Sequence, residues 1–102
     1  MQKRQPTIER SQLNKAQQGR YRYQLIDGPI LVEVALARQA DGLYQIVTDC
    51  AKSTNRQLSL PERQQQKAKS ILETLRLHFE QDLRRAGWLR RFTPNGQRWH
   101  LP

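Results

Sequence analysis

The chain has 102 residues, 18 of them Lys or Arg and 9 Asp or Glu, and carries a formal net charge of +9 at pH 7. This length predicts one domain, and the apolar fraction of 36% predicts a small core. The single cysteine, Cys50, excludes an internal disulfide and indicates a reducing compartment, and no stretch approaches the roughly 18 apolar residues that span a bilayer. We therefore expect a cytoplasmic protein with no membrane partner.

The first predicted element is a basic, flexible N-terminal arm over residues 1–18, and a single α+β domain is expected over residues 19–102. Beyond Met1, the arm has only Ile8 and Leu13 as sizeable apolar side chains. So little apolar surface cannot offset the entropy lost on ordering. A short helix from Ile8 to Gln17, with Thr7 as its N-cap, is the alternative for this segment.

Three strands of an antiparallel meander are expected next, because apolar and polar residues alternate with a period of two. The first covers residues 21–25 and ends at the turn sequence Asp-Gly-Pro at 27–29. The second, residues 30–37, is apolar on both faces and is therefore expected near the centre of the sheet. An Asp-Gly turn at 41–42 leads into the third strand, residues 43–49.

A long amphipathic helix is predicted over about residues 60–86, packed against one face of the sheet. Its apolar stripe recurs at steps of three and four residues and consists of Ala68, Leu72, Leu75, Phe79, Leu83 and Ala86. The sequence Ser-Leu-Pro-Glu at 59–62 predicts a capping box, in which the serine hydroxyl accepts a hydrogen bond from a free backbone N–H. Gly87 is expected to adopt a left-handed conformation that lets Trp88 fold back on Leu83.

A C-terminal hairpin is predicted to close the chain. Its strands cover residues 89–92 and 97–101, and Thr-Pro-Asn-Gly at 93–96 forms the turn between them. The expected fold class is therefore α+β, in which a three-stranded meander and a C-terminal hairpin form an antiparallel sheet against one long helix.

The C-terminal region carries the strongest candidate binding surface, because arginines alternate with aromatic residues there. Five arginines and no acidic residue lie between positions 84 and 98. The candidate contacts in this region are Arg84, Arg85, Arg90, Arg91, Arg98, Trp99 and His100. Arginine contacts phosphates and aromatic rings stack on exposed bases, so this pattern predicts a nucleic-acid interface. The sequence leaves open whether Trp88, Phe92 and Trp99 form a stacking surface or complete the core.

Two other basic segments are candidate nucleic-acid contacts. One lies on the predicted helix, with Lys67 and Lys69 in its first turns, and consists of Arg63, Lys67, Lys69 and Arg76. The alternative is an ordinary solvated helix face. Arg20 and Arg22 follow the basic arm. Such an arm can track a phosphate backbone, and the alternative is a terminus that only improves solubility.

The remaining side chains give no pattern typical of catalysis. The two histidines, His78 and His100, and one cysteine do not form a metal site, and we expect no cofactor. We expect a non-catalytic accessory or regulatory protein that binds DNA or RNA mainly through the phosphate backbone. One alternative is a protein-interaction module or inhibitor that docks on an acidic partner. Another is a small toxin-like RNase that uses His100 with Arg91 and Arg98. A homo-oligomer is a further alternative, because association would add buried apolar surface to a small core.

Overall fold

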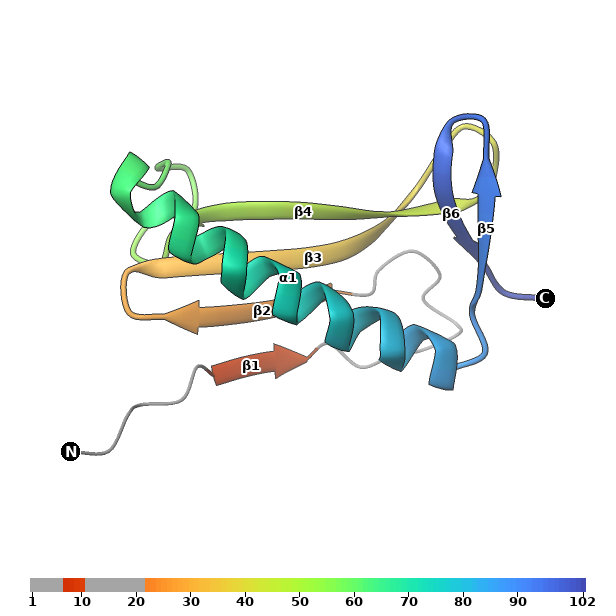
Figure 1. Ribbon diagram of the computed structural model, residues 1–102, viewed down its shortest axis with the longest axis horizontal. Helices are drawn as coiled ribbons and strands as arrows, with labels where there is room; N and C mark the ends of the chain where they lie inside the picture. Colours follow the sequence, from red (N-terminus) through yellow and green to blue (C-terminus); the bar gives the residue numbers. More distant parts are fainter. Residues whose placement is uncertain (1–6, 11–21) are drawn as a thin grey trace.

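The computed structural model describes residues 7–10 and 22–102, which form a six-stranded sheet and one helix (Figure 1). The elements in chain order are β1 (Thr7–Arg10), β2 (Arg22–Asp27), β3 (Ile30–Arg38), β4 (Tyr44–Lys52), α1 (Glu62–Arg85), β5 (Leu89–Thr93) and β6 (Gly96–His100). The strand order in the sheet is β1-β2-β3-β4-β6-β5, and every neighbouring pair is antiparallel. The predicted α+β class, with an antiparallel sheet against one long helix, is confirmed.

Strand β1 lies inside the segment that was predicted to be a flexible arm. It pairs with β2, so that Thr7 is opposite Ile26 and Arg10 is opposite Tyr23. The alternative helix that starts at Ile8 is therefore wrong for residues 8–10. An isolated helix of this length is marginal in water, whereas the edge of β2 offers unpaired backbone groups. The rest of the arm lies outside the described residues, and its flexibility stays a prediction.

Strand β3 lies between β2 and β4, which confirms the central position predicted from its two apolar faces. Every second residue from Ile30 to Leu36 is at most 2% exposed, and α1 covers this face of the sheet (Figure 1). On the opposite face Leu31 is also buried, whereas Glu33 is half-buried. The core therefore lies between the helix and one face of the sheet.

The predicted Asp-Gly turn forms between β3 and β4. Gly42 has a φ of 81°, a backbone conformation that favours glycine. The Leu43 N–H donates to Oδ1 of Asp41 at 2.9 Å, and the Gln39 N–H donates to the Leu43 carbonyl at 2.8 Å. These bonds fix the carboxylate of Asp41 at the end of the sheet from which the C-terminal hairpin extends.

Helix α1 begins at Glu62, and the predicted capping box does not form. The N-cap is Pro61, with φ −57° and ψ 147°, and no side chain caps the helix. Proline disfavours helical backbone at the residue before it, and the chain becomes helical after Pro61. Leu60 is consequently held outside the helix and is buried in the core, 5% exposed. Within the part of the chain that the structure describes, no helix is both long enough and apolar enough to cross a membrane.

The apolar stripe and the C-terminal end of α1 follow the prediction. The buried helix residues are Ala68, Leu75, Phe79 and Leu83, and Leu72 and Ala86 pack against the core at its margin. Gly87 has a φ of 95°. Its N–H donates to the Arg84 carbonyl at 3.0 Å, and the Trp88 N–H donates to the Leu83 carbonyl at 2.9 Å. This pair of bonds is a Schellman motif, and it turns Trp88 back into the core.

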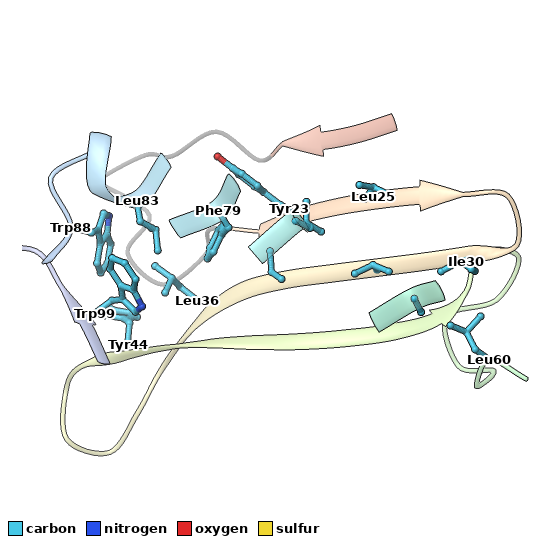
Figure 2. Close-up of a cluster of buried hydrophobic side chains, with 14 residues drawn as sticks. Tyr23, Leu25, Ile30, Leu36, Tyr44, Leu60, Phe79, Leu83, Trp88 and Trp99 are labelled. Carbon is cyan, nitrogen blue, oxygen red and sulfur yellow. The ribbon is translucent and has the colours of Figure 1, made fainter. Parts of the chain in front are cut away.

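The hairpin formed by β5 and β6 joins the sheet through one pair of residues, Tyr44 of β4 opposite Trp99 of β6. Figure 1 shows it at one end of the sheet, turned away from the direction of β2, β3 and β4. Trp88 and Trp99 are 2% and 1% exposed and lie together with Tyr44 at one end of the core (Figure 2). Both tryptophans therefore complete the core, which the sequence had left open, whereas Phe92 is 76% exposed.

Candidate nucleic-acid interface

The side of the hairpin that faces α1 carries Arg90, Phe92, Gln97 and Trp99. Arg90 is opposite Trp99 and Phe92 is opposite Gln97, so the alternation of side chains places all four on the same side. Trp99 is buried beside the helix, and the guanidinium carbon of Arg84 on α1 lies 6.0 Å from the centre of its ring. This side of the hairpin is therefore continuous with the C-terminal half of α1.

Gln97 connects the hairpin to the helix. Its Oε1 accepts a long hydrogen bond, 3.5 Å, from Nη2 of Arg76 on α1. With the amide group turned over, the same oxygen instead accepts from both Nε and Nη1 of Arg90, each at 3.2 Å. Each orientation bonds the amide oxygen to one of the two guanidinium groups, and both groups lie beside Gln97. We call Arg76, Arg84, Arg90, Phe92 and Gln97 the hairpin surface.

The hairpin surface carries a positive charge that is only partly offset. Nε of Arg76 lies 3.5 Å from Oε1 of Glu80, one helical turn further along α1. Among the described residues, no carboxylate lies within 4.0 Å of the guanidinium group of Arg84 or Arg90. Three arginines against one glutamate leave a net charge of +2. Arginines without an acidic partner are available to phosphate oxygens.

Phe92 is the most exposed of the large apolar side chains in the described part of the chain. The guanidinium carbon of Arg90 lies 5.3 Å from the centre of its ring, within the range of a cation–π contact. The ring makes no contribution to the core, because 76% of the residue is open to solvent. The hairpin surface thus combines an accessible aromatic ring with a guanidinium group beside it.

The other side of the hairpin holds three of the sequence-predicted contacts, Arg91, Arg98 and His100. Arg98 is 6% exposed, and its Nε lies 3.2 Å from Oδ2 of Asp41. It is committed to this ion pair and offers little surface to a ligand. Arg91, which is opposite Arg98, is exposed, and His100 is half-buried. The structure therefore separates these residues from Arg84 and Arg90, although they are close in sequence.

The predicted contacts on α1 outside the hairpin surface are Arg85, Lys67 and Lys69. Nη1 of Arg85 lies 3.7 Å from Oδ1 of Asp82. Lys67 and Lys69 lie in the N-terminal half of the helix, where Nζ of Lys67 is 3.4 Å from Oδ2 of Asp27. Lys69 is exposed and has no ion pair within the described residues. These cations can add to the general positive field but do not extend the hairpin surface.

The predicted contacts near the arm are not part of the hairpin surface either. Arg22 begins β2 on the sheet face that points away from α1, and its Nη1 is 3.9 Å from Oε2 of Glu33. Arg56 also pairs with this carboxylate, which is therefore shared between two arginines. Arg20 lies outside the described residues.

Within the hairpin surface, Gln97 was not among the candidate residues, and Arg76 was expected in a patch with Lys67 and Lys69, not with the C-terminal arginines. The charge of Arg76 is the signal that made it a candidate contact. Gln97 had no such signal. Its place depends on the register of β5 against β6, which puts it opposite Phe92.

A hollow of about 540 Å³ lies between the end of β4 and the start of α1, away from the hairpin surface. Cys50, Leu60 and Ala68 are among its lining residues. Burial, and secondly the negative charge of Asp49, raise the pKa of the Cys50 thiol above its ordinary value. A raised pKa disfavours the thiolate, which is the nucleophilic form, and favours a structural role for Cys50 over a reactive one.

Comparison with models of protein families, with curated proteins and with solved structures found no match. In the region that the structure describes, no three His, Cys, Asp or Glu side chains gather in a way that could hold a metal ion. A functional interpretation therefore depends on the surface chemistry of the chain itself.

Proposed function

We propose that the protein is a small, non-catalytic accessory or regulatory protein that binds nucleic acid, and that the hairpin surface is its binding site. The observation that carries this proposal is the position of Arg84 and Arg90, which have no acidic partner among the described residues, beside the exposed ring of Phe92. Guanidinium groups neutralise phosphates and release counterions, so most of the affinity would come from the nucleic-acid backbone. Binding of this kind needs no cofactor. We place the protein in the cytoplasm, as the sequence predicts.

The cations outside the hairpin surface have an auxiliary role in this proposal. The chain carries +9 overall, and a field of one sign raises the rate at which a polyanion is captured. Arg91 is exposed on the far side of the hairpin, and Lys69 is exposed on the helix. Both can contact phosphates that extend beyond the hairpin surface.

A protein-interaction module is the second candidate, and the exposure of Phe92 is the observation that favours it. Aromatic and arginine side chains dominate the binding energy of many protein interfaces. The same arginines would then face carboxylates of an acidic partner. The RNase alternative has less support, because Arg98, its expected phosphate clamp, is held by Asp41.

Titration of labelled single-stranded and double-stranded DNA and RNA over a series of salt concentrations tests the proposal. We expect binding at low micromolar protein that weakens with salt, because log K falls with log salt by about 0.9 per neutralised phosphate of duplex DNA. Binding to none of the four nucleic acids at low salt would contradict the proposal and leave the protein-interaction module in its place.

A further inference from the structure

We infer that the hairpin surface prefers single-stranded nucleic acid to duplex, and that an unpaired base stacks on the ring of Phe92. This inference rests on the proposed function and adds the class of ligand. Three observations support it: the ring of Phe92 is exposed, the guanidinium group of Arg90 contacts this ring, and the Gln97 amide in its turned orientation accepts hydrogen bonds from Arg90.

The ring of Phe92 is accessible in a way that phosphate binding alone does not require. A backbone-binding surface needs cations and hydrogen-bond donors, and an exposed phenyl group provides neither. Phe92 is 76% exposed. Among the described residues, the guanidinium group of Arg90 is the one cation that lies over its ring. The rest of the ring is open to a planar group.

A base can stack on the ring of Phe92 only if it is not already stacked between two neighbouring bases. In a duplex each base is stacked between two others and presents only its edges in the grooves. In a single strand the bases can separate and lie on aromatic side chains. One stacked base changes affinity by about 5- to 150-fold, which is enough to separate single strands from duplexes at equal phosphate contact.

Arg90 places a positive charge beside the stacking position. With the Gln97 amide in its turned orientation, both Nε and Nη1 of Arg90 donate to the amide oxygen at 3.2 Å. In this orientation Gln97 helps to hold the exposed guanidinium group near the Phe92 ring, 5.3 Å from its centre. A base on the ring brings its own phosphates close to this cation, so ring and cation together fit one nucleotide.

The test compares two ligands and a matched set of variants in the intact chain. The ligands are a fluorescein-labelled oligothymidylate and a mixed-sequence duplex of the same length, at one salt concentration. Phe92→Ala removes the stacking ring, and Phe92→Tyr retains it. Leu77→Ala removes another exposed apolar side chain, 61% exposed, which lies on α1 and not on the hairpin, and serves as the control. A single strand with one 2-aminopurine base reports stacking through its fluorescence.

We expect the native chain to bind the single strand more tightly than the duplex and to change the 2-aminopurine signal. Phe92→Ala should lower single-strand affinity by about 5- to 150-fold and duplex affinity by less than about twofold, while Phe92→Tyr and Leu77→Ala remain close to native. Equal affinity for both ligands, or an equal loss for both in Phe92→Ala, overturns the inference and leaves the proposed function intact. Binding of neither ligand overturns the inference. If single-stranded and double-stranded RNA also fail to bind, the proposed function is overturned as well, and Phe92 is favoured as an anchor for a protein partner. Each Phe92 variant is checked by its unfolding midpoint, which should not move because the ring is outside the core.

Discussion

Nε of Arg98 lies 3.2 Å from Oδ2 of Asp41, and this ion pair connects the C-terminal hairpin to the turn between β3 and β4. Only 8% of the Arg98 side chain is exposed, compared with 33% of the Asp41 side chain. The hairpin pairs with β4 through Tyr44 and Trp99 alone. The ion pair therefore adds a second connection, which helps to hold the hairpin surface in a fixed position at the end of the sheet.

Asp41→Asn should remove this ion pair and retain the turn, because the amide oxygen of asparagine can still accept the N–H of Leu43. We expect a loss of about 1.5–3 kcal/mol in the free energy of unfolding, since the charge of Arg98 remains buried without its partner. Urea denaturation measures the loss. Glu62→Gln, which neutralises an exposed carboxylate with no ion pair in the described region, is the control. A loss for Asp41→Asn no larger than that of the control would show that the ion pair contributes little.

Leu75→Ala should destabilise the fold strongly, because Leu75 is 0% exposed at the middle of the helix stripe. Removal of a buried leucine side chain costs about 2–5 kcal/mol. Leu77, two residues later, is 61% exposed, and its replacement by alanine should change stability by less than about 0.5 kcal/mol. Equal unfolding midpoints for the two variants would mean that the stripe is not the packed face of the helix.

Gly87→Ala should destabilise the end of α1 by about 1–2 kcal/mol, because a side chain disfavours positive φ. The φ of Gly87 is 95°, and an added Cβ would have no other atom within 4 Å. The cost is therefore conformational and not steric. Gly87→Asn is the matched variant, since asparagine tolerates this backbone region better than alanine. Thermal unfolding should rank the native chain above the asparagine variant and the asparagine variant above the alanine variant. The reverse order of the two variants is incompatible with a left-handed helix end.

Cys50 should react slowly with iodoacetamide, because burial and the charge of Asp49 raise the pKa of its thiol. The rate should increase with pH over a higher range than that of a cysteine in an unstructured peptide, since only the thiolate reacts. Asp49→Asn removes one of the two causes and should shift this range downward. Mass spectrometry of the alkylated protein follows the rate. A rate at neutral pH equal to that of the peptide would show that the thiol is not shielded.

Elements with a strong local pattern were predictable from the sequence. The three- and four-residue spacing of the helix stripe identified the buried face of α1, and Gly87 identified its end, because both effects act within a few residues. The helix begins at Glu62 and not at about residue 60, because Pro61 disfavours helical backbone at Leu60 and the capping motif does not form. Strand β1 was not predicted, because its pairing with β2 is a contact between distant segments.

The candidate site was only partly predictable, because cations that are adjacent in sequence diverge in the structure. Arg90 and Arg91 lie on opposite sides of β5, as strand alternation requires. Which side faces α1 depends on the pairing of Tyr44 with Trp99, which no local pattern specifies. The burial of Arg98 likewise depends on a carboxylate that is 57 residues away in the chain.

The most direct test of the binding site is a comparison of two double variants that remove the same charge from different places. Arg84→Ala with Arg90→Ala removes two cations of the hairpin surface, and Arg63→Ala with Lys69→Ala removes two exposed cations from the N-terminal half of α1. Both variants have the same net charge, so any difference in nucleic-acid affinity reports position.

Fluorescence anisotropy with a labelled duplex over a salt series measures this difference. The hairpin variant should bind all sequences more weakly at low salt, and its slope of log K against log salt should be flatter by about 1.8, or 0.9 for each lost phosphate contact. The control variant should change both quantities less. Equal effects of the two variants, or a larger effect of the control, would contradict the assignment of binding to the hairpin surface.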